Sequence, residues 1–356
     1  MTIPVFNPDP ANFTTRIDNP FMTLRPGSTF FYENQSGGEE VSFEVLRETV
    51  VVNGVTCVVV HDTARVNGLV VEDTYDWFAQ DLAGNVWYFG EATESFAPGN
   101  PDPVSTDGSW EAGVGGAQPG ILMLADPMIG DAYAQEFAPG IAEDRARVLS
   151  LSATVHVGYG SFGDALKTRD INPLDASVES KFYVQGVGNV LTTNASGEYE
   201  QLVRIEIEGT DGNDRLRGYG GGDQMFGRSG DDRLIGGDGN DNMSGGSGAD
   251  DLRGGRGFDR LKDGGGDDVL SGGKGGDRFV FRNHDDGQAD IDTITDYRRS
   301  QVDVIDIAGG VAGIAAEALV GGVWLLTLAG DGDIIRLLGV VDTNSDGHIL
   351  DNLLIG

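Results

Sequence analysis

The sequence predicts an all-β protein in which an antiparallel β-domain precedes a stack of short repeats. Three observations support this prediction. Residues 209–280 follow a strict nine-residue period. Residues 40–91 alternate polar and apolar side chains and turn at Asn53-Gly54 and Asn67-Gly68, a pattern typical of β-hairpins. Glycine and proline dominate residues 98–140, which favours long loops with at most short helices.

The repeats divide residues 209–280 into eight consecutive nine-residue units. A period held this strictly indicates a stack, because one unit is too small to bury its own apolar face. Every unit has glycine at its fourth position, aspartate at its sixth and a large apolar residue at its eighth. The glycines are Gly212, Gly221, Gly230, Gly239, Gly248, Gly257, Gly266 and Gly275. The aspartates are Asp214, Asp223, Asp232, Asp241, Asp250, Asp259, Asp268 and Asp277. The apolar residues are Leu216, Met225, Leu234, Met243, Leu252, Leu261, Leu270 and Phe279.

The residue types within one unit predict a metal site. Glycines at the first and fourth positions permit positive φ and close backbone approach, so we expect the first six residues to form a tight loop with inward carbonyls. The aspartate adds an anionic oxygen to those carbonyls. Ligation by oxygen alone suits Ca²⁺ better than Mg²⁺, which demands a stricter octahedron. The last three residues, such as Arg215-Leu216-Arg217, alternate polar and apolar and predict a short strand.

The units resemble the haemolysin-type, or RTX, repeat, GGxGxDxUx, in which U is large and apolar. The resemblance implies a parallel β-roll with calcium between successive turns and the eight aspartates as ligands. If each ion lies between units n and n+2, eight units allow at most six complete sites. Asp263 replaces the opening glycine of unit seven. Thr210, Tyr219 and Arg228 occupy the second position of the first three units, so we expect the amino-terminal turns to bind more weakly.

Charge and length restrict the partners. The chain has 356 residues, enough for two or three domains, and we expect boundaries at 1–208, 209–280 and 281–356. A formal charge of −33 excludes nucleic acid as a partner, since phosphate binding needs clustered basic residues. So many carboxylates repel one another unless cations neutralise them. We therefore expect the repeats to fold on calcium, which extracellular modules bind with Kd of ~10⁻⁴–10⁻³ M.

Several features favour export. Cys57 is the single cysteine, so no intramolecular disulfide can form. Residues 1–10 lack the basic and apolar regions of a signal peptide, and no apolar run reaches the ~18 residues of a transmembrane helix. Calcium repeats without a cleavable leader resemble the substrates of type I secretion, which carry an uncleaved carboxyl-terminal signal. The final Leu353-Leu354-Ile355-Gly356 is similar to such signals. We expect a secreted protein and the type I machinery as a partner.

The segment after the repeats resembles the cap of RTX rolls. It contains Phe279-Val280-Phe281, residues 290–297 and residues 303–307, which are similar to the pattern F-x-F, D-x-I-x-D-F and D-x-I-D-L. Tyr297 stands where phenylalanine is usual. A stack needs such a cap to cover its last apolar layer. The resemblance implies that Asp290, Asp292 and Asp296 complete one further calcium site. Residues 342–347 match the first half of an EF-hand loop, but Leu353 replaces its final glutamate, so an incomplete site and an ordinary turn both stay open.

Residues 1–208 predict eight or nine antiparallel strands that form a barrel or a sandwich. Their most unusual stretch spans 73–91, where acids alternate with large aromatic residues. Strand alternation places Asp73, Tyr75 and Trp77 on one face. These aromatics are either the walls of a ligand cleft or ordinary core. For the cleft, the candidates for binding an unknown extracellular ligand are Tyr75, Trp77, Trp87, Trp110 and Gln118.

Catalytic motifs are scarce. The chain has no H-E-x-x-H and no G-x-S-x-G, which excludes a serralysin-type protease and a nucleophile-elbow hydrolase. His61 and His156 lie in apolar strand stretches, which favours satisfied core or rim histidines over the alternative of a ligand or catalytic base. Carboxylate chemistry stays open, with Asp73, Asp76, Glu91 and Glu111 as the candidate acids. Two functions therefore remain: a secreted calcium-dependent binding protein, or a secreted hydrolase or lyase. The lining of the largest cavity in residues 1–208 distinguishes them.

Overall fold

The protein is all-β, as predicted. The computed structural model describes residues 8–35, 37–282, 290–307, 314–320, 323–328 and 333–338. The regular elements within them are strands and two short 3-10 helices, Pro10–Asn12 and Arg299–Gln301. None of the helices in these ranges is long and apolar enough to span a bilayer. The chain divides into two compact units, Met1–Ile205 and Glu206–Gly356.

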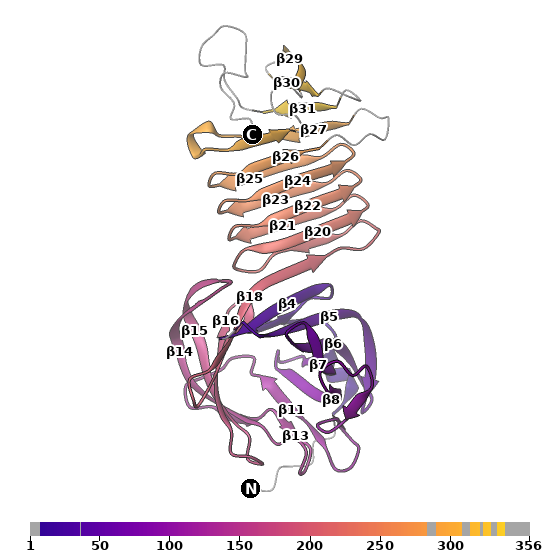
Figure 1. Ribbon diagram of the computed structural model, residues 1–356, viewed down its shortest axis with the longest axis vertical. Helices are drawn as coiled ribbons and strands as arrows, with labels where there is room; N and C mark the ends of the chain where they lie inside the picture. Colours follow the sequence, from indigo (N-terminus) through magenta and orange to yellow (C-terminus); the bar gives the residue numbers. More distant parts are fainter. Residues whose placement is uncertain are drawn as a thin grey trace. The chain divides into compact units, whose positions relative to one another are not determined.

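Long antiparallel hairpins make up most of the first unit (Figure 1). The Asn-Gly turns are present as predicted: Asn53 and Asn67 have φ of 47° and 53°, and the glycines that follow have 80° and 78°. These values fit type I′ turns, in which both central residues need positive φ. The strands are β1 (Phe13–Thr14), β2 (Ile17–Asn19), β3 (Met22–Leu24), β4 (Ser28–Asn34), β5 (Glu39–Val52), β6 (Val55–Val66), β7 (Leu69–Asp81), β8 (Val86–Phe96), β9 (Pro103–Ser105), β10 (Trp110–Glu111), β11 (Gln118–Met123), β12 (Ala132–Ala134), β13 (Glu136–Phe137), β14 (Arg145–Val157), β15 (Gly160–Ile171), β16 (Val178–Val184), β17 (Gly188–Asn194) and β18 (Tyr199–Glu208).

The sheet of this unit closes into a barrel. Antiparallel pairing runs from β4 through β5, β6 and β7 to β8, and from β14 through β15, β16 and β17 to β18. One seam closes where β18 pairs with β4. The other closes through β11, which pairs with β8 and β13, and through β12, which pairs with β14. Of the two predicted architectures, the structure therefore has the barrel. A barrel of this size can hold one small ligand.

The loop-rich segment differs from expectation in detail. Residues 98–140 contain no helix but five short strands, β9 to β13, which complete the barrel wall. The sequence did not predict these strands, because four of the five are only two or three residues long and carry no measurable alternation. Gly120 illustrates the fit: a Cβ at this position would overlap the backbone of Gln135.

The second unit contains a parallel roll of two facing sheets, the architecture expected for the repeats (Figure 1). One sheet pairs β20, β22, β24, β26 and β28, and the other pairs β19, β21, β23, β25 and β27. The strands are β19 (Arg215–Arg217), β20 (Asp223–Ser229), β21 (Arg233–Asp238), β22 (Asn242–Ser247), β23 (Asp251–Arg256), β24 (Arg260–Gly265), β25 (Val269–Lys274), β26 (Arg278–Phe281), β27 (Ile291–Ile294), β28 (Val304–Ile307), β29 (Ile314–Val320), β30 (Val323–Leu328) and β31 (Ile334–Leu337).

One turn of the roll contains two nine-residue units, one in each sheet. Leu234 pairs with Leu252, and Leu252 pairs with Leu270, at intervals of two units. The eighth-position residues thereby form two apolar columns. Seven of them, from Met225 to Phe279, are completely buried, so the predicted core is confirmed.

The strands are longer than the sequence predicts. In β22 (Asn242–Ser247) they take in the last three positions of one unit and the first three of the next. The loop is thus three residues long, such as 248–250, and the expectation of a six-residue loop was wrong. The reason is parallel pairing: Gly237 pairs with Gly255, and Gly246 with Gly264, so the ladder continues through the glycines.

Beyond the repeats the ladders continue into a β-rich cap. β26 pairs with β28 and β27 with β31, both in parallel, and β31, β30 and β29 then pair antiparallel. Phe281, Ile305 and Leu326 are buried beneath them. Two features singled out in the sequence lie outside the described residues: the loop at 342–347 and the terminal segment at 353–356.

Candidate functional site

The sixth-position aspartates of the roll form two ladders of their own. The backbone N–H of each aspartate donates to Oδ1 of the aspartate eighteen residues further on, at 2.7–3.0 Å throughout the repeats. One ladder runs from Asp214 to Asp268 and the other from Asp223 to Asp277. Each of the six carboxylates from Asp232 to Asp277 therefore holds the preceding turn through Oδ1, which leaves its second oxygen available for another partner.

That second oxygen is buried and unsatisfied in six of the eight repeats. Within the repeats, the buried Oδ2 atoms without a hydrogen-bond partner belong to Asp232, Asp241, Asp250, Asp259, Asp268 and Asp277. All six residues are at most 3% exposed. A buried carboxylate oxygen without a partner is costly, and proteins normally supply a donor or a cation. A regular row of such atoms indicates that a bound ligand, rather than another protein group, is their partner.

Glycines make room for that ligand. A Cβ at Gly236 would overlap Oδ2 of Asp241 and approach the carbonyl oxygen of Gly254 at 2.7 Å. First-position glycines therefore leave a carboxylate oxygen and a carbonyl oxygen facing one small space. The fourth-position glycines act differently: from Gly230 to Gly275 their φ lies between 105° and 140°, which only glycine adopts readily.

The electrostatics of the row favour a cation. Burial raises the pKa of Asp241, Asp250 and Asp259 to about 7 and that of Asp268 to about 8. Facing carboxylates contribute as well, since Asp223 raises the pKa of Asp241 and Asp232 that of Asp250. A divalent cation beside these oxygens would remove both penalties. Carboxylate and carbonyl oxygens are the donors that Ca²⁺ prefers, so these residues fit a calcium ion.

The candidate calcium sites do not depend on clustered acids. In the described ranges no three Asp, Glu, His or Cys side chains converge on one point that could hold a metal. Each candidate calcium site in the roll combines one aspartate carboxylate with backbone carbonyl oxygens instead.

The predicted catalytic residues of the first unit divide into separate groups. On one face of β6 and β7, His61 Nε2 bonds to Asp73 Oδ1, and the imidazole stacks on Tyr75 with ring centroids 4.5 Å apart. Thr63 Oγ1 lies 3.3 Å from the same His61 nitrogen. Both members of the His61–Asp73 pair are about a quarter exposed, at 27% and 28%. The pair is thus a surface feature.

Asp76 and Glu91 come together on another face. They are paired positions of β7 and β8, and the Tyr88 hydroxyl donates to Asp76 Oδ1 over 2.5 Å. Burial raises the pKa of Asp76 well above its ordinary range, and burial also raises that of Glu91. Trp110 packs edge-on against Tyr88 at 5.3 Å. These residues form a buried polar cluster.

The remaining candidates lie apart from both groups. Glu111 and His156 are exposed, and His156 Nδ1 lies 2.9 Å from Ser161 Oγ. The Trp87 indole N–H donates to Asp81. Trp77 and Gln118 are half-buried on different strands. The five aromatic and amide candidates are therefore not brought together in one cleft.

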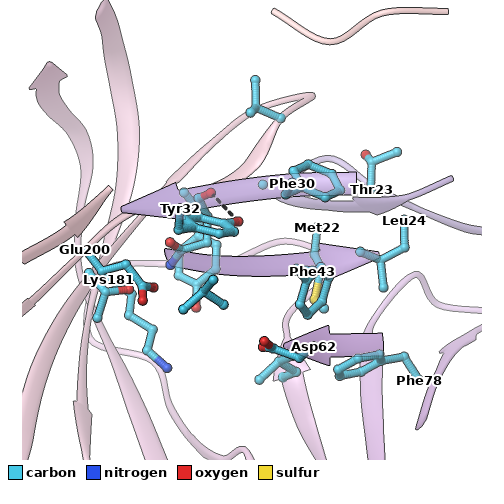
Figure 2. A pocket seen from close by; sticks show the side chains of 17 residues that line it. Met22, Thr23, Leu24, Phe30, Tyr32, Phe43, Asp62, Phe78, Lys181 and Glu200 are labelled. Atoms are coloured by element: carbon cyan, nitrogen blue, oxygen red, sulfur yellow. Dashed lines mark hydrogen bonds between the residues drawn. The ribbon is translucent and has the colours of Figure 1, made fainter. Parts of the chain in front are cut away.

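A cavity of about 210 Å³ opens inside the barrel, and none of the predicted residues lines it. Its walls come from β3, β4, β5, β6, β7, β11, β16, β17 and β18 (Figure 2). Asp62 and Lys181 are among the residues that line it. Sequence reasoning missed them. For Asp62 a signal existed, because an acid interrupts the apolar run of residues 55–64.

Comparison with known proteins identifies the roll. The family model of the RTX calcium-binding nonapeptide repeat matches residues 208–243 and again residues 244–279. Residues 208–279 are RTX calcium-binding repeats. A comparison with curated proteins finds no match.

Among solved structures, three similar chains each cover part of this one. A Bacteroides fragilis protein described as exported, with a YmcC-like fold, is 13% identical over 52% of this chain and 98% of its own, with a TM-score of 0.31. A Parabacteroides distasonis protein described as a lipoprotein is 11% identical over 52% of this chain and 97% of its own, with a TM-score of 0.29. The AlgE6R3 subunit of the Azotobacter vinelandii mannuronan C5-epimerase is 29% identical over 41% of this chain and 80% of its own, with a TM-score of 0.25.

The first turn of the RTX roll differs from the middle. Oδ2 of Asp214 accepts from the backbone N–H and the hydroxyl of Thr210, and Oδ2 of Asp223 accepts from the Tyr219 N–H at 2.7 Å. These are two of the second-position residues that depart from the glycine pattern. Protein donors here take the oxygen that is free elsewhere in the RTX roll.

The RTX cap extends both aspartate ladders. Asp268 N–H donates to Asp292 Oδ1, and Asp277 N–H donates to Asp303 Oδ1, each at 3.1 Å. Asp303 was missed because the spacing changes to 26 residues, although Asp303-Val304-Ile305 repeats the D-x-U triplet.

The other two predicted cap acids are hydrogen-bonded to backbone N–H groups. Asp290 Oδ2 accepts from the Gly266 N–H at 3.0 Å. Asp296 accepts from the N–H groups of Gly272 and Gly273 and from the Ser271 hydroxyl at 2.8–3.0 Å. Of the three predicted cap acids, Asp292 therefore continues a ladder, whereas Asp296 holds the last turn of the repeats through its own hydrogen bonds.

Proposed function

We propose that this protein is an exported calcium-binding protein whose RTX roll folds on extracellular calcium and whose amino-terminal barrel binds an extracellular ligand. The proposal includes the division into residues 1–208, 209–280 and 281–356. The observation that carries it is the row of six buried carboxylate oxygens without partners. Calcium between neighbouring turns would give each of these oxygens the partner it lacks.

In the proposed roll, ions lie beside Asp232, Asp241, Asp250, Asp259, Asp268 and Asp277. This proposed number equals the upper limit of six sites expected from the sequence. The sites lie towards the cap because Thr210 and Tyr219 satisfy the first two carboxylates. Asp292 and Asp303 support the last ions through the extended ladders. At free calcium ten times the Kd, each site adds ~1.4 kcal/mol to the free energy of unfolding. Six sites add roughly 8 kcal/mol, which is comparable to the ~5–15 kcal/mol of a whole domain.

We propose export by a type I system, with which this calcium dependence is compatible. A chain of formal charge −33 resists compaction at low calcium, because its carboxylates repel one another. It would therefore remain unfolded, and so transportable, until it meets extracellular calcium. Support comes from the repeats and the charge; the terminal segment expected to carry the signal lies outside the described residues.

For the barrel we propose binding rather than catalysis. The buried Asp76–Tyr88–Glu91 cluster and the His61–Asp73 pair line neither the apolar cavity nor the larger polar one. Asp62 and Glu200 do line the apolar cavity, but apolar side chains form most of its wall. Such a wall supports binding of a ligand with an apolar part.

Calcium titration of the full chain tests the proposal. Far-ultraviolet circular dichroism and thermal unfolding are followed from chelator to millimolar calcium, with magnesium as the matched control. We expect β-structure and Tm to rise together with calcium, to fall again with chelator, and to respond weakly to magnesium. Indifference of both signals to chelator would contradict calcium-dependent folding.

A further inference from the structure

The cavity in the barrel is built for an apolar molecule of limited size. Its volume of about 210 Å³ exceeds the ~150 Å³ of an apolar protein cavity that binds benzene. Phe30, Phe43 and Phe78 line it together with Met22 and Leu24 (Figure 2). Burying an apolar ligand against such walls is favourable, because it removes the apolar surface from water.

Asp62 interrupts this apolar wall. It projects from β6 into the cavity, where Figure 2 shows it beside Phe43 and Phe78. Burial, the nearby charge of Glu200 and other acids raise the pKa of Asp62 to about 7. A carboxyl in such surroundings is stabilised by a ligand that brings a positive charge or a hydrogen-bond donor.

The apolar cavity adjoins a second, acidic cavity, which we call the entrance. A wider polar cavity of about 590 Å³ shares Lys181, Thr192 and Glu200 with the apolar one. Four glutamates line it, Glu39, Glu179, Glu198 and Glu200, against one lysine.

The charge of Lys181 is already offset. Its Nζ lies 3.5 Å from Asp170 Oδ2 and 3.7 Å from Glu179 Oε2. The lysine is therefore not available as the counter-ion for an anionic ligand. The remaining carboxylates give the entrance a negative potential, which attracts cations and repels fatty acids and other anions.

We propose that the barrel binds a small cationic amphiphile, with its apolar body between the phenylalanines and its protonated amine paired with the Asp62 carboxylate. This inference rests on the proposed function of the barrel as a binding domain and names its ligand class. The acidic entrance concentrates such molecules, and the aromatic wall adds cation–π attraction.

Calorimetric titration of the calcium-loaded full chain with octylamine, 1-octanol and octanoate tests the proposal. The three probes share one apolar chain and differ in the charge of their polar end. We expect octylamine to bind about tenfold or more tightly than octanoate, with octanol between them. Octanoate binding as well as octylamine would overturn the cationic ligand class while keeping the barrel as a binding domain. Absence of binding by all three probes would overturn both.

Two variants assign the effect to the cavity. Asp62→Asn keeps the shape of the side chain and removes its charge, so octylamine affinity should fall about tenfold while octanol affinity is unchanged. Glu200→Gln should weaken octylamine binding in the same direction and provides a second test if Asp62→Asn folds poorly. Glu94→Gln, an exposed acid of β8, is the matched control and should change nothing. Equal octylamine affinity in all three variants and the parent chain would contradict the proposed pairing.

Discussion

The backbone N–H of Asp232 donates to Oδ1 of Asp250 at 2.8 Å, and Oδ2 of Asp250 is left buried without a partner. One side chain thus has two tasks: its first oxygen connects two turns of the roll, and its second is directed to a cation. The hydrogen bond offsets the cost of burying the first oxygen, but the cost of burying the second remains. Calcium binding and the cohesion of neighbouring turns therefore depend on the same carboxylate.

Replacing Asp250 separates the two tasks. Asp250→Asn keeps an oxygen that can accept from Asp232 N–H and removes the negative charge. We expect the calcium affinity of the nearest site to fall about tenfold or more, which corresponds to ~1.4 kcal/mol. Calcium titration monitored by calorimetry measures this loss. Asp238→Asn is the matched control, because the Asp238 side chain is 70% exposed on the same roll. Asp214→Asn should lower calcium affinity less than Asp250→Asn does, because Thr210 already donates to Oδ2 of Asp214. Equal losses of affinity would argue that this oxygen binds calcium despite Thr210.

Alanine substitutions at the fourth-position glycines should destabilise the roll by different amounts in different turns. Gly248 has a φ of 122°, and a Cβ there would overlap the carbonyl of Gly230. We expect Gly248→Ala to cost at least about 1–2 kcal/mol in the free energy of unfolding, since an L side chain is strained at this φ. At Gly212 the nearest atom to an added Cβ is Thr210 Oγ1 at 3.9 Å. Gly212→Ala should be nearly neutral. Thermal unfolding in calcium compares the two, and similar Tm losses would contradict the packing described here.

The apolar column should carry much of the stability of the roll. Leu252 is completely buried between Leu234 and Leu270. Leu252→Ala should lower the free energy of unfolding by about 2–5 kcal/mol, because it removes buried surface and leaves a cavity. Phe258 is 69% exposed, so Phe258→Ala should change stability by at most about 0.5 kcal/mol. Denaturant unfolding in saturating calcium measures both. A larger loss for Phe258→Ala would show that the exposed ring has a structural partner.

The buried carboxyl of Asp76 should make barrel stability depend on pH. Burial raises its pKa well above the ordinary ~3.9, so the folded state keeps a proton that the unfolded state has lost. Stability therefore falls as pH rises from about 4 towards the raised pKa, by up to ~1.4 kcal/mol per pH unit for this group. Asp76→Asn should remove that part of the pH dependence and raise stability at alkaline pH relative to the parent chain.

Other buried acids, including Glu91 and Glu136, titrate in the same direction. The difference between the pH profiles of Asp76→Asn and the parent chain isolates the contribution of Asp76. Glu111→Gln, an exposed acid, is the control and should follow the parent chain. Parallel pH profiles for Asp76→Asn and the parent would show that Asp76 is ionised in both folded and unfolded states.

The sequence predicts the roll well because each unit repeats the same local rules. The eighth-position residues were correctly expected in the core, and the RTX identity follows from the glycine and aspartate spacing. The extent of the strands was not predictable from one unit, since Gly246 joins a strand only by pairing with Gly264 two units later. Asp303 was not predicted as part of a ladder for a related reason. An insertion breaks the nine-residue period before it, and only the hydrogen bond from Asp277 shows that it continues the ladder.

The barrel is harder to predict because its site depends on closure. Asp62 and Lys181 lie on strands far apart in sequence, yet line one cavity. The acid–aromatic hairpin at 73–91 has the expected alternation, but its buried face supplies core contacts such as Phe78 against Tyr88 at 4.9 Å. Local pattern identified the strands and the turns. Which strand faces meet across the interior is decided by pairings such as β18 with β4, which no local pattern contains.

The pairing interval of eighteen residues has a consequence for how such a chain can grow or shrink. Deleting a single nonapeptide would transfer every later unit to the opposite sheet, so the cap strands would arrive at the wrong ladders. Deleting two adjacent nonapeptides would shorten the roll by one turn and leave the cap strands in register. The height of this roll can therefore change only in even steps, by gene duplication or by design.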